Sequence, residues 1–339
     1  MKKALFIGGT GTISMAITRA LAAGGEWELY LINRGSRNEE LPENVNVINV
    51  DINDEEKIDA ILDGRAFDCV CDFIGFAPEH IERDHRLFRG RCAQFIYISS
   101  ASAYNKPCRN HIITEGTALA NPFWEYSRNK IYCESFLMDK YEKEGFPVTI
   151  VRPSHTYDER SVPVAVHGRY GSWQVIRRML EGKPVLVHGD GTSLWTMTHN
   201  TDFAKGFIGL MGNPHALGES FQITSDETLT WNQIYEAIAA ALDVDYIPYY
   251  VSSEFLASVS DYDYFGSLLG DKSNSVVFDN SKIKRAVPGF NCTVRFDQGV
   301  RNTIDYVLSH PECQIPDPEF DEFCDRVIDE LEEAKDRLR

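Results

Sequence analysis

Tyr126 and Lys130 are four residues apart in the segment EYSRNK, inside a stretch of helical length at about 123 to 144. On a helix with 3.6 residues per turn, side chains at this spacing lie on one face. A free phenol titrates near ~10, too high for a base at neutral pH, but a neighbouring ammonium favours the phenolate. The pair could therefore take a proton from an alcohol, although a surface tyrosine beside a solvated lysine has the same spacing.

A hydroxyl group can join this pair from the end of a strand. The apolar segment AQFIYISSASAY predicts a strand that reaches Ser99 and Ser100 at its carboxyl end. Open α/β sheets place their active sites at this edge. We therefore predict that a strand-end serine lies near the Tyr126 and Lys130 side chains.

The N-terminal segment FIGGTGTIS predicts a phosphate-binding turn between a strand and a helix. Gly8 permits a tight turn, and Gly11 removes a side chain so that backbone N–H groups can approach a pyrophosphate. Ser14 stands where the pattern G-x-x-G-x-x-G has its third glycine. That glycine mainly lets the helix pack closely, so a small serine is tolerated, and it could also cap the helix. The turn thus predicts dinucleotide binding.

The second strand ends in LINRG, where NAD-binding proteins usually carry Asp or Glu for the ribose. Here Asn33 is neutral and Arg34 follows. A guanidinium without a carboxylate favours the 2′-phosphate of NADP, although Arg34 could also point into solvent. Asp51, which ends NVINVD, lies where a carboxylate could contact adenine.

Overall composition narrows the classes of partner. The net charge of -17 and the lack of a basic run argue against nucleic-acid binding. No stretch approaches the roughly 20 apolar residues of a membrane span. The eight cysteines lack paired C-x-x-C spacing, which favours free thiols and a cytoplasmic location. His80 and His85 are five residues apart, so we predict no metal site.

These features together resemble the extended short-chain dehydrogenases/reductases of the NAD-dependent epimerase/dehydratase family. The similarity covers residues 3–157 in GGTGTIS, VDIND, DFIGFAP, FIYISSASAY, YSRNK and VRPSHTY, and continues loosely through DGTSLWTMTHNTDFAKGF and NCTVRFDQGVRNTIDYV. It implies that Tyr126 is the acid/base, that Lys130 binds the nicotinamide ribose and lowers the tyrosine pKa, and that Ser100 binds the reacting hydroxyl or carbonyl. Tyr104 supports this register, because sugar epimerases carry a matching Ser-x-x-x-Tyr segment.

The resemblance and the alternating strand and helix patterns predict an α/β fold with a Rossmann-type doubly wound parallel sheet. We predict a dinucleotide-binding domain at 1–165 with return elements at about 184–225. The remaining 166–339 is predicted to be mainly a smaller substrate-binding region with a C-terminal helix. Within it, Thr230 and Gln233 have the spacing of a capping box.

The predicted cofactor is NAD or NADP, and Asn33 with Arg34 favours NADP. The predicted cofactor-binding residues are Gly8, Thr10, Gly11, Thr12, Ile13, Asn33, Arg34, Asp51, Ile52, Phe73, Ile74, Gly75, Ser99, Tyr126, Lys130, Pro153 and His155.

The substrate side departs from the family pattern. Dehydratases of the family carry acidic residues where this chain has Ala101 and Ser102, so dehydration is disfavoured. His155 stands near the place of a substrate-binding asparagine, and could be a substrate contact, a second proton carrier or an ordinary loop histidine. Trp195 replaces an arginine that many sugar-nucleotide enzymes use.

A diphosphate clamp could instead come from Arg169, Arg177 or Arg178, which could equally be surface charges. The candidate substrate contacts are Ser102, His155, Arg169 and Trp195.

The predicted function is NAD(P)-dependent epimerisation of a sugar or sugar nucleotide through a transient keto intermediate. The alternative is an NADPH-dependent reductase or dehydrogenase of a small carbonyl or sugar compound. A third interpretation is a non-catalytic cofactor-binding or RNA-associated protein. By analogy, the helical segments near 78–90 and 123–144 could form a homodimer interface.

Overall fold

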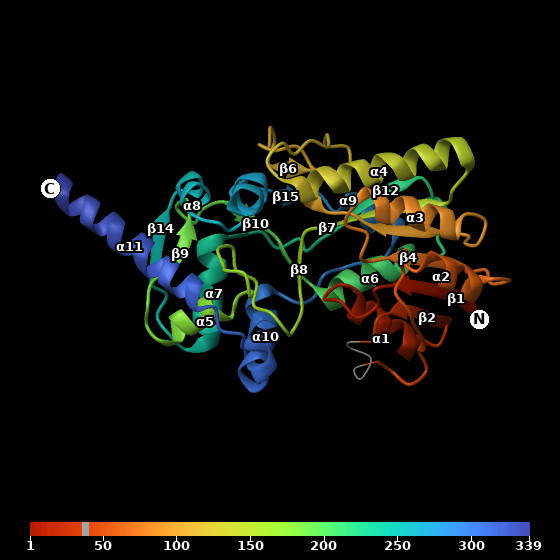
Figure 1. Cartoon of the computed structure of the whole chain (residues 1–339), viewed down its shortest axis with the longest axis horizontal. Helices are drawn as coiled ribbons and strands as arrows, with labels where there is room; N and C mark the ends of the chain where they lie inside the picture. Colours follow the sequence, from red (N-terminus) through yellow and green to blue (C-terminus); the bar gives the residue numbers. More distant parts are fainter. Residues whose placement is uncertain (36–40) are drawn as a thin grey trace.

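The computed structural model describes residues 1–35 and 41–339, and these contain a seven-stranded parallel sheet of order β12-β7-β5-β4-β1-β2-β3 (Figure 1). The strands are β1 (Lys2–Ile7), β2 (Trp27–Asn33), β3 (Asn46–Asn49), β4 (Cys69–Asp72), β5 (Phe95–Ile98), β7 (Val148–Pro153) and β12 (Glu219–Ile223). The strand order reverses between β1 and β4, which makes the sheet doubly wound. The predicted fold class is confirmed.

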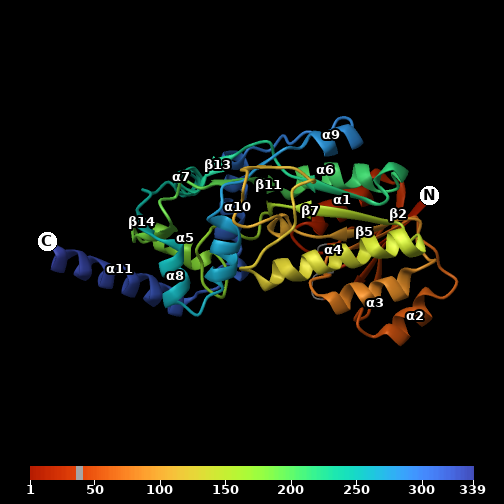
Figure 2. The ribbon, with the colours of Figure 1, turned by 90° about the horizontal axis from the view of Figure 1, so that it is seen from above.

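Helices cover both faces of this sheet (Figure 2). One face carries α1 (Ser14–Gly24) and α6 (Asn200–Leu210), and the other carries α2 (Glu55–Leu62), α3 (Pro78–Phe88) and α4 (Glu125–Glu144). Side chains of β1 alternate between the faces, because Phe6 packs into the α1 and α6 core while Leu5 and Ile7 pack into the opposite core. Burial on both faces explains why the strands are apolar throughout.

Helix α4 brings the tyrosine and lysine of the candidate site to the sheet. Lys130, Cys133 and Leu137 are buried at a spacing of three and four residues, which forms the stripe that faces the strands. The helix ends at Gly145, whose left-handed backbone (φ +69°) lets its N–H bond to the carbonyls of the last turn.

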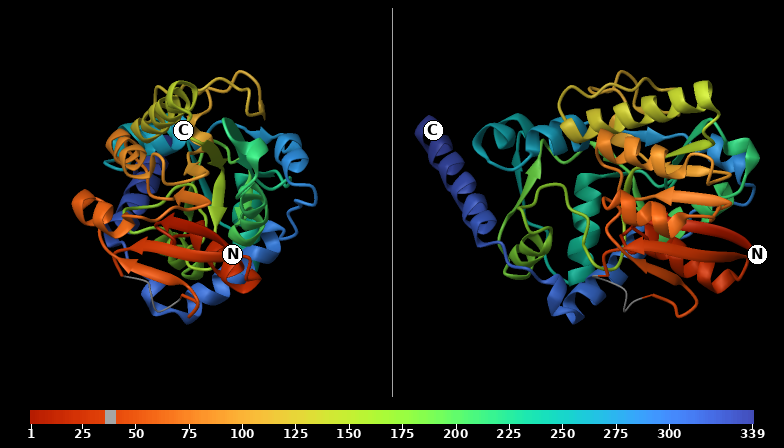
Figure 3. Two further views of the ribbon diagram at one scale, coloured as in Figure 1. Left: turned by 90° about the vertical axis from the view of Figure 1, so that its right-hand side faces the viewer. Right: turned by 45° about the vertical axis from the view of Figure 1, so that its right-hand side comes forward.

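The second region of the chain has its own apolar core, which includes Trp231. Its helices are α5 (Trp173–Leu180), α7 (Trp231–Leu242), α8 (Ser253–Val259), the π-helical η4 (Phe265–Lys272), α10 (Phe296–Ser309) and α11 (Pro318–Leu338). Helix α9 (Ser281–Ala286) instead packs on β12 and α6 of the central sheet region. Its strands are β8 (His155–Tyr157), β9 (Val185–His188), β10 (Leu194–Trp195), β11 (Met197–His199), β13 (Leu229–Thr230), β14 (Pro248–Val251) and β15 (Val277–Phe278). The remaining short elements of the whole chain are β6 (Ile112–Ile113), η2 (Ala101–Ala103), η3 (Pro214–Ala216) and η5 (Pro311–Cys313). Helix α11 extends away from the rest of the molecule (Figure 3).

Two local predictions for this second half can be compared with the structure. The Thr230 and Gln233 capping box at the start of α7 is present. Of the predicted return segment at about 184–225, β12 joins the central sheet and α6 packs on α1, whereas β9 pairs with β14 outside that sheet. Strands β10 and β11 also pair outside that sheet, with β13 and β8. An isolated apolar strand does not show in the sequence which sheet it will join. Across the described residues, no helix combines the length and apolarity needed to cross a bilayer.

Candidate active site

The turn between β1 and α1 is shaped by its glycines and by Ser14. Gly8 has a left-handed backbone (φ +82°), and a Cβ there would lie 2.4 Å from the Cγ2 atom of Ile74. The Ser14 hydroxyl donates to the Gly8 carbonyl at 2.7 Å and accepts from the Gly11 N–H at 2.8 Å. Ser14 is therefore a brace inside the turn. The suggestion that its side chain caps the helix is wrong, because Ile13 is the N-cap residue and no side chain caps it.

The rim of the same turn is suited to an anionic ligand. A Cβ at Gly11 would meet only the Ser14 Oγ atom, at an ordinary 3.5 Å, so the protein's own packing does not require a glycine there. The N–H groups of Thr12 and Ile13 donate to no acceptor among the described residues. Unsatisfied N–H groups at a helix N-terminus favour a phosphate.

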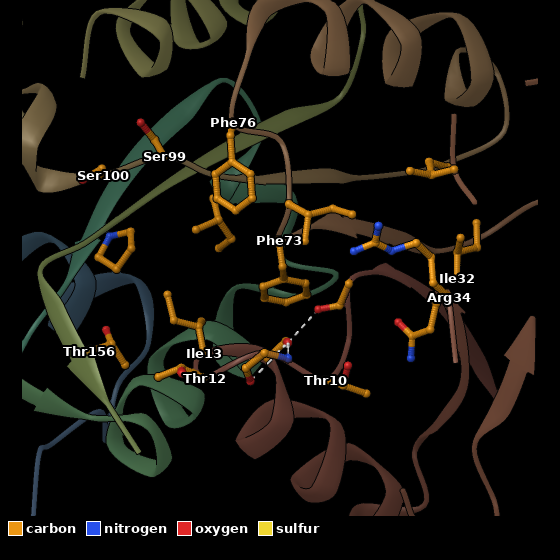
Figure 4. A pocket seen from close by; sticks show the side chains of 18 of the residues that line it. Thr10, Thr12, Ile13, Ile32, Arg34, Phe73, Phe76, Ser99, Ser100 and Thr156 are labelled. Atoms are coloured by element: carbon orange, nitrogen blue, oxygen red, sulfur yellow. Dashed lines mark hydrogen bonds between the residues drawn. The ribbon is translucent and has the colours of Figure 1, made fainter. Parts of the chain in front are cut away.

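A cavity of about 810 Å³ extends from this turn along the carboxyl edge of the sheet (Figure 4). The predicted cofactor residues that line it are Gly8, Thr10, Gly11, Thr12, Ile13, Asn33, Arg34, Asp51, Ile52, Phe73, Ile74, Ser99, Tyr126, Lys130, Pro153 and His155. Lining residues that the sequence analysis did not single out as cofactor contacts are Ser14, Ile32, Gly35, Val50, Asn53, Phe76, Ile98, Ser100, Ser154 and Thr156. Several of these directly adjoin a predicted residue, which is the sequence signal that could have identified them.

One end of the cavity is formed by the carboxyl ends of β2 and β3. Asn33 is buried, and its Nδ2 atom has no hydrogen-bond partner among the described residues. An orphaned buried donor is costly unless a ligand satisfies it. The Arg34 side chain extends into the cavity beside it (Figure 4). The rim of the turn and this orphaned donor together fit a dinucleotide, with the pyrophosphate at the turn and the adenosine ribose near Asn33.

Lys130 is held in place by backbone carbonyls. Its Nζ atom donates to the carbonyls of Gly75 and Ile98, at 2.7 Å in both cases. Burial lowers the pKa of Lys130 to about 8, against the opposing charge of Asp72. Gly75 was predicted to bind the cofactor, but it is not among the cavity-lining residues and instead fixes the Lys130 ammonium.

Tyr126 lies beside this ammonium, with the Lys130 Nζ atom 5.7 Å from its ring centroid. Burial raises the pKa of Tyr126 to about 12, and a hydrogen bond with the Ser100 side chain opposes that rise. The expected lowering of this pKa by Lys130 is therefore not found in the protein alone, and the phenol stays protonated at neutral pH. The structure thus brings together the three residues that were predicted to act as a set.

The two strand-end serines have different surroundings. The Ser99 hydroxyl donates to the Glu134 carboxylate at 2.5 Å, and Arg152 pairs with that same carboxylate in the interior. The Ser100 hydroxyl instead lies 2.9 Å from the Ser102 hydroxyl at the cavity edge. Ser100 is therefore the serine that is available to a substrate.

A second cavity of about 280 Å³ adjoins the first and shares Ser100, Tyr126, Pro153, Ser154 and His155 with it. Its other lining residues are Ala101, Ser102, Lys106, Trp124, Trp195, Asp271, Lys272, Val276 and Phe278. We call it the substrate cavity, and the larger one the cofactor cavity.

Three predicted substrate contacts line the substrate cavity. Ser102 is buried and accepts a hydrogen bond from Ser127, and Trp195 donates from Nε1 to the Nδ1 atom of His155 at 3.4 Å. Burial lowers the pKa of His155 to about 3, and nearby Lys272 adds to the effect. The imidazole is therefore neutral at physiological pH.

The predicted arginine contacts do not reach these cavities. Arg169 is exposed, lies over the Tyr262 ring and lines neither cavity. Arg177 pairs with Glu181 on the surface. Arg178 is buried and bound to carboxylates of α11, so it is neither a clamp nor a surface charge. Sequence position alone did not show this, because its partners lie over 140 residues away.

The described residues contain no group of three or more His, Cys, Asp or Glu side chains that could hold a metal ion.

A doubly wound sheet with a glycine turn after β1 and a Ser, Tyr and Lys set at its edge defines a dinucleotide-dependent enzyme class. A profile described as "NAD dependent epimerase/dehydratase family" matches residues 4–224. The chain belongs to this family, and it is an NAD(P)-dependent enzyme of the extended short-chain dehydrogenase/reductase type.

Individual relatives are distant. The chain is 24% identical over 292 residues to 2'-dehydrokanamycin reductase of Streptomyces kanamyceticus, covering 85% of this chain and 80% of that protein. It is 26% identical over 253 residues to the chloroplast stem-loop binding protein of 41 kDa b of Arabidopsis thaliana, covering 71% of this chain and 63% of the relative.

Among solved structures, UDP-glucuronic acid 4-epimerase of Bacillus cereus, in complex with UDP-glucuronic acid and NAD, is similar with a TM-score of 0.73. The match covers 91% of this chain and 99% of the epimerase at 19% identity, so it shows the shared fold.

Proposed function

We propose that this protein is an NAD(P)-dependent epimerase that acts on a sugar or sugar nucleotide through a transient keto intermediate. The observation that carries the proposal is that Tyr126 and Ser100 line both the cofactor cavity and the substrate cavity. A carbinol at this junction would lie within reach of both hydroxyl groups. When bound, the nicotinamide supplies reversible hydride transfer with the carbinol carbon.

Each side chain has a role that follows from its surroundings. Tyr126 exchanges a proton with the substrate oxygen, and Ser100 hydrogen-bonds the same oxygen. Two carbonyls hold Lys130, and one of its three N–H donors remains for the ribose. Burial lowers the pKa of His155 to about 3, which makes its imidazole a weak base, so His155 acts as a substrate contact and not as a second proton carrier.

The same proposal extends to NADP as the preferred cofactor. Arg34 lines the cofactor cavity, and the end of β2 carries Asn33 in place of a carboxylate that would repel a 2′-phosphate. If this is correct, Arg34→Gln should weaken NADP binding about tenfold and leave NAD binding within twofold. Equal effects on both cofactors would contradict the preference.

A reductase of a small carbonyl or sugar compound is the second candidate. The protonated Tyr126 phenol is the form that donates a proton to a carbonyl, and the Streptomyces relative is named a reductase. Among the described residues, no arginine lines the substrate cavity, which also supports a substrate without a diphosphate.

The nucleotide released from the purified protein separates the two candidates. An epimerase recycles its hydride, so denaturing the protein should release close to one NAD(H) or NADP(H) per chain, measured by mass spectrometry. A reductase should be purified largely empty and should consume NADPH stoichiometrically with a carbonyl compound. A chain that binds no dinucleotide at millimolar concentration would contradict both.

The RNA-associated interpretation has the name of the chloroplast relative in its favour and the net charge of -17 against it. A filter-binding assay with a structured RNA at physiological salt tests it. We also propose that the protein is cytoplasmic, which the lack of paired C-x-x-C spacing among its cysteines supports, and that it forms a homodimer through the adjacent α3 and α4 helices (Figure 2).

A further inference from the structure

The substrate cavity has charged side chains in its wall that the proposed reaction does not use. These are Lys106, Asp271 and Lys272. The Lys106 Nζ atom lies 3.9 Å from the Asp271 carboxylate, and both lysines are at least nine-tenths buried. The wall itself thus carries two ammonium groups and one carboxylate, and Asp263, outside the wall, is a second carboxylate that acts on Lys272.

Neither ammonium group is well satisfied by the described residues. Lys272 donates to the Ser267 carbonyl at a long 3.4 Å, and its Nζ atom is 6.0 Å from the Trp124 ring centroid. Lys106 reaches the Cys108 sulfur at 3.7 Å besides its distant contact with Asp271. An ammonium carries three donors, and a buried charge is costly unless it is paired and hydrogen-bonded.

The backbone around Lys272 is firmly positioned. Its carbonyl accepts hydrogen bonds from the Ser193 hydroxyl at 3.1 Å and from the Trp231 indole at 3.3 Å. Lys272 is the last residue of the π-helical η4, and helices of this kind are frequent at functional sites. The fold thus orders the backbone of Lys272 while leaving its ammonium group poorly paired.

The π-helix also packs closely against the start of α4. A Cβ at Gly266 would lie 2.1 Å from the Trp124 ring, and the Trp124 indole donates to Asp263 at 2.7 Å. The Trp124 ring then packs on Tyr126, with centroids 5.0 Å apart. Through this packing, Lys272 is placed in fixed relation to the reacting hydroxyl groups.

The charges influence one another across the cavity. Burial raises the pKa of Asp271, and both lysines oppose that rise. Burial lowers the pKa of Lys272, and Asp271 and Asp263 oppose the decrease. Asp271 also raises the pKa of Tyr126, so this carboxylate acts on the proposed acid/base residue.

We propose that Lys106 and Lys272 form an anion subsite, and that the substrate of the proposed reaction carries an anionic oxygen group, a carboxylate or a phosphate, on the sugar ring that reacts. The cavity of about 280 Å³ suits a single ring, because it is near the lower end of small-molecule sites. Ammonium groups form strong charge-assisted hydrogen bonds with carboxylate and phosphate oxygens. Asp271 remains to accept a ring hydroxyl.

The test compares sugars that carry an anionic group with their neutral counterparts. The protein saturated with NADP or NAD is titrated by calorimetry with D-glucose, D-glucuronate and D-glucose 6-phosphate. UDP-glucose and UDP-glucuronate serve as a second matched pair. We expect at least one anionic sugar to bind more than tenfold tighter than its neutral counterpart, and the two anions distinguish a carboxylate from a phosphate.

Substitutions of the two lysines test whether they cause the preference for anionic sugars. Lys272→Met and Lys106→Met should each reduce the preference to within threefold, while cofactor affinity stays unchanged. Lys143→Met, an exposed lysine of α4 that pairs with Asp139, removes the same charge elsewhere and should leave the preference intact. Using both subsite variants protects the test against one that fails to fold.

Several outcomes would overturn the subsite. Equal binding of neutral and anionic sugars, no binding by either anion, or a preference that survives both variants would each do so. If the cofactor binds but the anions do not, this inference fails while the proposed function stands. If no dinucleotide binds, the proposed function fails first.

Discussion

The cofactor cavity and the substrate cavity meet at Tyr126 but are built in different ways. The cofactor cavity is lined mostly by short runs of neighbouring residues that follow the strands of the sheet, such as 10–14 after β1. The substrate cavity is formed by side chains from segments more than 100 residues apart, including Lys106 and Lys272. The first depends on local backbone shape, and the second depends on tertiary packing and buried charge.

Replacing Tyr126 should have the largest effect, because this residue belongs to both cavities. Tyr126→Phe removes the proton donor and should lower kcat by about 1,000-fold, within the range for general acid–base catalysis. Cofactor affinity should stay within threefold, measured by fluorescence titration. Tyr132→Phe, an exposed tyrosine of the same helix, is the control. More than a tenth of the activity remaining in Tyr126→Phe would remove this residue from its role.

The buried Lys130 ammonium predicts how stability depends on pH. Its pKa is about 8 in the native chain and close to 10.5 when unfolded, so between these values the unfolded chain binds more protons. The wild type should therefore gain stability relative to Lys130→Met as the pH rises from 8 to 10.5, by about 3 kcal/mol at most.

Urea unfolding of both proteins without cofactor, at intervals across this pH range, measures the difference between their free energies of unfolding. Titrating groups that do not interact with Lys130 cancel, because they are common to the two proteins. A difference that stays flat from pH 8 to 10.5, or that falls, would show that the lysine is not destabilised by burial.

Substitutions at two glycines of the turn should affect ligand binding and folding differently. Gly11→Ala meets no close contact in the protein, so it should fold normally and raise the cofactor Kd by about 30-fold, because its methyl group crowds the pyrophosphate. Gly8→Ala places a side chain on a left-handed backbone against Ile74 and should lower Tm as well. Similar losses of Tm in both variants would contradict this difference between Gly8 and Gly11.

The same contrast explains what the sequence could predict. The turn at Gly8 and the pair Tyr126 and Lys130 were predictable, because their spacing of three or four residues fixes the geometry within one turn or one helix. The role of Lys272 was not predicted, because its significance comes from burial beside Asp271 and Trp124, which no local pattern encodes. Arg169 lines neither cavity, which the sequence did not show either, since the position of a charged residue along the chain does not show which way its side chain points.

Replacing Ser14 should have the smallest effect of these substitutions. It tests whether a single hydrogen-bonding side chain in the turn contributes to cofactor binding. Its hydroxyl bridges the Gly8 carbonyl and the Gly11 N–H, so Ser14→Ala should remove about 1 kcal/mol of support from the turn. We expect a Kd for the cofactor about fivefold higher and a slightly lower Tm, with kcat unchanged, because the substrate cavity does not include this residue. Ser14→Gly restores the usual third glycine and should lose the same bridge. If Ser14→Gly instead binds the cofactor more tightly than the wild type, close helix packing matters more at this position than the brace does.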